Sequence, residues 1–296
     1  MELSISDNDF LDAFDKINTF DVDTHGKNKL DLFVLKINAN EFNYQNLQQK
    51  LLEPMANYSL SRITKEQYKN KPMELSKKAR EKFIDHLKNK GELGELLLYC
   101  FLESHLKAPK ILSKLELKTS RNMYVNGADG VHYLKLKNGD YQLIFGESKI
   151  EKQLTSGLTN AFKSINKFKR EVGKSGINYE KSLISDHISK ETFSDKEKKF
   201  IENIIYPKKE NNFEVDDAFG IFIGYEISIS DDKALLNQDF RNKIKQKVEQ
   251  EVYSKLRHIE SKINDYNLQG HNFYIYVLPF TELDKTRKSI TKSITS

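Results

Sequence analysis

The sequence predicts an α/β protein in which a central mixed sheet is flanked by helices. From Gly91 onward, segments with helical spacing of apolar residues alternate with short apolar runs typical of strands. Two of these runs are separated by Asn138-Gly139, a strong signal for a hairpin turn. Two later runs, Ala218–Tyr225 and Phe273–Leu278, flank a long amphipathic helix, as expected for buried strands.

Residues 1–88 are predicted to form an N-terminal α/β layer. After a polar lead, the alternating stretch Leu30–Ile37 favours a strand. Helical patterns follow near residues 41–53 and 73–88.

Residues 89–280 are predicted to form the core, in the order αβββαβαβ. In chain order, the first expected elements are a helix from Gly91 to before Pro109, strands at about 111–118, 129–137 and 141–150, and a helix over 150–172. They are followed by a helical insertion at about 173–215, a strand over 218–225, a helix over 236–263 and a strand over 273–278. Residues 281–296 are predicted to form a basic C-terminal tail.

Composition narrows the class of protein. The chain has 296 residues, and its 18 Phe and 14 Tyr are ample material for a core. Its net charge of +5 would mildly attract a polyanion. The single Cys100 lies in an apolar run and cannot form an intramolecular disulfide. Neither a signal peptide nor a membrane span is evident, so we expect a cytoplasmic protein.

Ionisable residues concentrate on two neighbouring predicted strands. Glu147 and Lys149 project from the same face because side chains alternate along a strand. The hairpin should bring Asp129, which is bracketed by Gly127 and Gly130, beside them. Two carboxylates can hold Mg²⁺, or Mn²⁺ in its place, while a lysine assists the attacking water. This pattern indicates phosphodiester hydrolysis, although a bare Glu-x-Lys can also be a surface ion pair.

These residues resemble the Asp…Glu-x-Lys signature of the restriction-endonuclease-like nuclease superfamily, PD-(D/E)xK. Ala128 stands where many members have proline. The resemblance implies that Asp129 and Glu147 bind the metal and that a glutamate from the preceding helix joins them. By position this is Glu95, with Glu92 as the alternative. Gln153 stands where many relatives carry a polar residue of the active site.

A closer resemblance runs from Gly91-Glu-Leu-Gly-Glu through Asn126-Gly-Ala-Asp-Gly to Phe145-Gly-Glu-Ser-Lys. These segments are similar to the HamA family, nuclease subunits of the bacterial Hachiman anti-phage defence system. The resemblance implies a DNA-degrading effector that works with a helicase subunit, HamB, and it makes residues 1–88 and 173–215 candidates for docking or restraint. A non-catalytic adaptor that binds a helicase or nucleic acid is the alternative, and RNA as substrate stays open.

Overall fold

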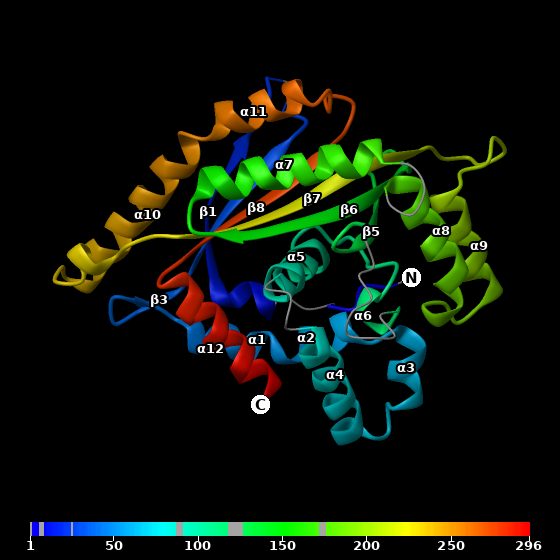
Figure 1. Cartoon of the computed structure of the whole chain (residues 1–296), viewed down its shortest axis with the longest axis horizontal. Coiled ribbons are helices and arrows are strands. Elements are labelled where there is room, and N and C mark those ends of the chain that lie inside the picture. The colour runs from blue at the N-terminus through cyan, green and yellow to red at the C-terminus, as the bar shows by residue number, and fades with distance from the viewer. Residues whose placement is uncertain (1, 6–8, 25, 87–90, 118–126, 172–175) are drawn as a thin grey trace.

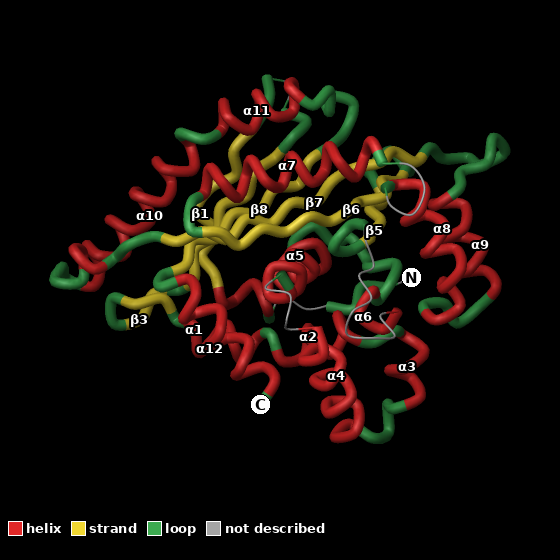
Figure 2. The backbone as a smooth tube through the Cα atoms, viewed as in Figure 1, coloured by secondary structure: helices red, strands yellow, loops and turns green. Residues whose placement is uncertain are grey.

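Six strands form one mixed sheet. Figure 1 and Figure 2 show this sheet between the helices that surround it. The computed structural model describes residues 2–5, 9–24, 26–86, 91–117, 127–171 and 176–296. In spatial order the strands are β1 (Phe14–Asp21), β2 (Lys29–Leu35), β8 (Phe273–Phe280), β7 (Val215–Glu226), β6 (Tyr141–Glu151) and β5 (Val131–Lys135). The four inner strands are parallel, and β1 and β5 pair antiparallel with their neighbours at the two edges.

Helices cover both faces of the sheet. On one face, α7 (Leu154–Arg170) packs on β6 and β7, and α10 (Asn237–Tyr253) and α11 (Leu256–Asp265) continue the layer toward β1 (Figure 1). On the other face, α5 (Glu92–Ser104) packs under the same two strands. The sequence explains the difference, because α5 is apolar on nearly every side whereas α7 has one apolar stripe and exposed lysines.

The remaining elements lie around this core. They are η1 (Phe10–Ala13), β3 (Ile37–Asn38), β4 (Glu41–Phe42), α1 (Tyr44–Lys50), α2 (Leu52–Ser59), α3 (Arg62–Gln67), α4 (Pro72–His86), α6 (Lys114–Leu117), α8 (Ile177–His187), η2 (Ile188–Lys190), α9 (Asp195–Ile205), η3 (Ser230–Asp232) and α12 (Leu283–Thr295). In the described part of the chain, no helix has the length and apolar character needed to cross a lipid bilayer.

Two glycines let α5 approach the sheet closely. Gly146 of β6 pairs with Gly220 of β7, and a Cβ at these positions would lie 2.9 Å and 3.0 Å from the side chains of Leu98 and Leu102 on α5. Even-numbered residues of β6 therefore face α5. By alternation the odd-numbered residues, including Glu147 and Lys149, face α7.

The α/β class with a mixed sheet is confirmed, but the restriction-endonuclease order is not, because the strand predicted at 111–118 is wrong. Residues 109–111 run beside β5 and make one isolated bridge, Lys110 to His132, after which residues 114–117 turn into α6. Residue 118 and the following eight lie outside the described residues. The error arose because a short apolar run does not distinguish a strand from a buried helical turn.

Three other segments differ from the predictions. The polar lead contains β1, an edge strand that joins β2 in the central sheet. The helix predicted over 236–263 is broken at Ser254 into α10 and α11. The predicted tail is α12, which buries Leu283, Ile290 and Ile294 and packs on α1 and α4. The other predicted strands, the hairpin with Gly139 at a φ of +97°, and the helices of the insertion are observed.

Candidate active site

Asp129 lies against β6, immediately before β5 begins. Val131 pairs with Phe145, and the backbone N–H of Gly146 donates to the carbonyl of Gly130, so the segment before β5 stays against β6. The backbone N–H of Asp129 donates to the carbonyl of Gly146 at 2.8 Å. Its Oδ2 atom accepts from the backbone N–H of Ser148 at 2.6 Å and from the Ser148 hydroxyl at 2.7 Å. The structure thus brings Asp129 to the Glu-x-Lys segment and fixes its carboxylate there.

Glu147 and Lys149 form an ion pair of 2.5 Å on the α7 side of β6. Their side chains are 12% and 28% exposed. Burial and the nearby charge of Asp129 raise the pKa of Glu147 to about 7, against the opposing influence of Lys149. Burial alone would lower the pKa of Lys149, but the Glu147 carboxylate outweighs it and the pKa is raised. Ionised Glu147 is therefore costly here, and a bound cation would relieve that cost.

Glu95 lies in the first turn of α5, on the opposite face of the sheet from Glu147. Its Oε2 atom accepts from the hydroxyl of Tyr58 at 2.7 Å. Glu95, Tyr58 and Asp129 line one small cavity of about 10 Å³, which is room for about one water molecule. Burial, followed by Glu95 and then Asp129 and Glu92, raises the pKa of the Tyr58 hydroxyl well above its usual range. Glu92 is 1% exposed in the same turn, so both glutamates remain candidates for the site.

The donor set suits a hard divalent cation. Among the described residues, no group of three or more His, Cys, Asp or Glu side chains converges to hold a metal ion. Mg²⁺ is commonly held by only one or two carboxylates, with waters and substrate phosphates completing its coordination. The charge of Asp129 contributes to the raised pKa of Glu147, although Asp129 is bonded to Ser148 on the α5 side of β6 and Glu147 lies on the α7 side.

Four residues near Asp129 were not singled out by the sequence. Ser148 is the central residue of Glu-x-Lys. The motif could have pointed to it, since the position between Glu147 and Lys149 must face the opposite side of the strand, toward α5. Tyr58, Lys114 and Glu180 reach the Asp129 region from distant segments, where no spacing pattern could reveal them. Gln153, which was considered for the site, is exposed at the start of α7.

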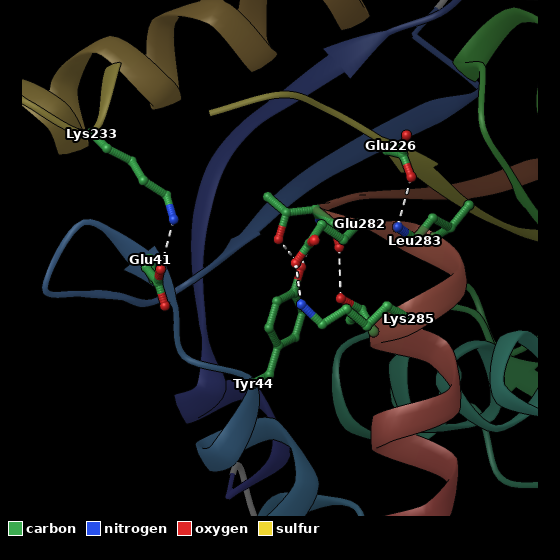
Figure 3. Close-up of polar contacts among 9 residues, drawn as sticks. Glu41, Tyr44, Glu226, Lys233, Glu282, Leu283 and Lys285 are labelled. Carbon is green, nitrogen blue, oxygen red and sulfur yellow. Dashed lines mark hydrogen bonds and ion pairs between the residues drawn. The ribbon is translucent and has the colours of Figure 1, made fainter. Parts of the chain in front are cut away.

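A much larger cleft lies elsewhere, beyond the carboxyl ends of β7 and β8 (Figure 3). Its volume is about 520 Å³, and its walls carry the ion pairs Lys233 to Glu41 at 2.7 Å and Lys285 to Glu282 at 3.0 Å. Glu226 accepts from the backbone N–H at the start of α12 at 2.7 Å. The charged side chains that line this cleft thus already have bonding partners, and none of the candidate site residues lines the cleft. Asp129 with Glu147 and Lys149 therefore remains the candidate site, because of the chemistry of these residues and not because of cavity size.

Comparison with known proteins assigns the family. The family model described as HamA matches residues 8–294, nearly the whole chain. None of the curated proteins searched matches the chain. The chain belongs to the HamA family.

Proposed function

We propose that this HamA-family chain is a Mg²⁺-dependent DNA nuclease that acts as the effector of a bacterial anti-phage defence complex with a HamB-like helicase subunit. Family membership supports a Hachiman-type role in anti-phage defence. The observation that best supports hydrolysis is that Asp129 is bonded to Ser148, the residue between Glu147 and Lys149, so that two carboxylates and a cation are gathered at one partly buried stretch of β6. Burying charged groups together costs desolvation free energy, and such groups cluster at functional sites.

Each residue has a distinct part in the proposed reaction. When bound, the metal ion polarises the phosphate and makes its coordinated water more acidic. Asp129, oriented by the two hydrogen bonds from Ser148, and Glu147 would hold the ion. Lys149 would exchange its partner Glu147 for the substrate, orient the attacking water and offset the developing negative charge. Exposed Lys163, Lys167 and Arg170 on α7 would contact phosphates without regard to sequence.

The test is cleavage of plasmid DNA, linear DNA and RNA, with Mg²⁺, with Mn²⁺ and with EDTA, by the chain alone and with the helicase. We expect metal-dependent cutting of DNA that EDTA abolishes. Glu147→Gln and Lys149→Met should each lose about 100-fold or more in rate, as expected for the loss of a charged group acting on the transition state. The matched control is Glu151→Gln on the same strand face, where Glu151 accepts from Asn160 at 2.7 Å and raises the pKa of Lys149 less than Glu147 and Asp129 do. It should cut at the wild-type rate.

The alternative is a non-catalytic adaptor. It is favoured by the pairing of Lys149 with Glu147 and by the lack, in the described residues, of a three-ligand metal cluster. If no nucleic acid is cut under any of these conditions while DNA or the helicase is still bound, the adaptor is the better assignment.

A further inference from the structure

The short segment that carries Asp129 is held at three consecutive residues. Asp129 is fixed to β6 through Gly146 and Ser148. The carbonyl of Ala128 accepts a hydrogen bond from the Nζ of Lys114. Gly127 packs against the side chain of Glu180. Two of the three contacts therefore come from residues that have no part in the proposed chemistry.

Lys114 and Glu180 form a buried ion pair. Lys114 Nζ lies 2.7 Å from Glu180 Oε1, and the two side chains are 8% and 0% exposed. Lys114 belongs to α6, and Glu180 belongs to α8 in the insertion, so the pair joins two distant segments directly over the Asp129 segment. Burying such a pair costs desolvation, and apolar side chains of similar size often stabilise a fold as well or better. An apolar side chain, however, could not donate to the Ala128 carbonyl.

Gly127 shows how tightly Glu180 fits. Its φ of +141° is a conformation that residues with a side chain rarely adopt. A Cβ built on Gly127 would lie 2.0 Å from Oε2 of Glu180, well inside contact distance. The carboxylate thus packs directly on the backbone two residues before Asp129, and a larger residue at position 127 would displace one or the other.

We propose that Lys114 and Glu180 form a clamp that positions Asp129, and that the insertion acts on the active site through Glu180. Both are positioning residues, since they act through Ala128 and Gly127. The part of the proposal that concerns cleavage rests on the proposed nuclease function. The part that concerns the placement of Asp129 does not.

A second ion pair on α8 provides a comparison within the same helix. Lys181 Nζ lies 3.0 Å from Asp217 on β7, and these side chains are 17% and 25% exposed. This pair fastens α8 to the sheet rather than to the Asp129 segment. The insertion thus has an anchor of its own, so anchoring alone does not explain the more costly pair at Glu180.

The experiment compares Glu180→Gln, the double variant Lys114→Met/Glu180→Leu and the control Lys181→Met in the full chain. Hydrogen exchange is measured at the backbone amides of Asp129 and Ser148, which are bonded to the Gly146 carbonyl and the Asp129 carboxylate. Urea unfolding gives stability, and cleavage gives kcat and KM. The apolar double variant should recover stability, because it leaves no unpaired buried charge.

The clamp predicts that both amides exchange faster in Glu180→Gln and in the double variant, but not in Lys181→Met. It also predicts that kcat falls by about 10- to 100-fold with KM for DNA nearly unchanged, since a small misplacement of a catalytic group is enough for such a loss. The proposal is overturned if both amides exchange at the wild-type rate in Glu180→Gln and in the double variant, and if the double variant recovers kcat together with stability. If the wild type cuts nothing but the amides still respond, the nuclease function fails and the positioning of Asp129 stands.

Discussion

Strands β6 and β7 lie side by side in parallel register but carry opposite chemistry on the face that α7 covers. Glu147 pairs with Ile221 and Lys149 pairs with Ile223. Both isoleucines are fully buried. On the opposite face the two strands match, since glycine faces glycine beneath α5. The fold therefore accepts β-branched apolar residues at this level of the sheet and does not itself require charge on β6.

The difference shows that β6 gives up stability that β7 keeps at the same level of the sheet. Isoleucine suits a buried strand both in backbone preference and in packing. Glu147 instead has its pKa raised to about 7, first by burial and then by Asp129, which expresses the cost of its charge. Local rules of folding are usually broken at functional positions. The contrast with β7 thus supports a functional reason for the Glu-x-Lys of β6.

The largest expected effect comes from making β6 like β7. In the double variant Glu147→Ile/Lys149→Ile, we expect cleavage to fall by about 1,000-fold or more, since both a metal-binding carboxylate and the lysine are removed. The free energy of unfolding should rise by about 1–3 kcal/mol, because an apolar pair replaces a partly buried ion pair. Urea unfolding and plasmid cleavage measure both. A variant that is less stable than the wild type would mean that the charges of β6 serve the fold.

The next effect in size is that of Asp129→Asn. The amide oxygen of asparagine can still accept from Ser148, so the segment should keep its place while its charge is lost. We expect cleavage to fall by about 100-fold. The pKa of Glu147 should fall toward its ordinary value of 4.5, because Asp129 is the second cause of its rise. A titration of Glu147 followed by NMR checks this, and an unchanged pKa would mean that the two carboxylates do not act on each other.

The last expected effect is a pH dependence of stability that Ile221 and Ile223 of β7, which do not titrate, cannot share. The pKa of Glu147 is about 7 in the folded chain and near 4.5 when unfolded, so the folded state binds this proton more tightly. The free energy of unfolding should therefore decrease as pH rises from about 4.5 to 7, by about 3 kcal/mol at most. Relative to the wild type, Glu147→Gln should gain stability over that window and show no further change above it. Urea unfolding at several pH values, with Glu151→Gln as the control, measures the difference in unfolding free energy between Glu147→Gln and the wild type. This difference should be larger at pH 8 than at pH 5, and equal values at the two pH values would contradict the prediction.

The sequence predicted what depends on local periodicity. Alternation in β6 assigned Glu147 and Lys149 to one face, and Asn138-Gly139 set the hairpin that brings Asp129 to them. The apolar run of α5 and the stripe of α7 predicted which helices pack on the sheet. These patterns are readable because burial imposes a period of two on a strand with one polar face and a period near 3.6 on a helix.

What failed depends on contacts between distant residues. β1 has few buried positions because it lies at an edge, so its pattern did not stand out. The run at residues 111–117 was ambiguous, and its helical end matters because it carries Lys114. The pairing of Lys114 with Glu180 joins segments 66 residues apart, and nothing in the spacing of either residue indicates the other. The residues that contact the Asp129 segment could therefore be identified only from the three-dimensional structure.

The position of β8 has a consequence for the order of folding during synthesis. β8 lies between β2 and β7 and pairs with both, although it is the last strand along the chain. Until residues 273–280 leave the ribosome, β2 and β7 have no partner between them and the two halves of the sheet cannot join. Such non-local pairing is slow and leaves strand edges exposed. A chain interrupted before β8 would leave β7, the neighbour of the strand that carries Glu147 and Lys149, unsupported on one side, so translation itself would delay the appearance of an assembled site.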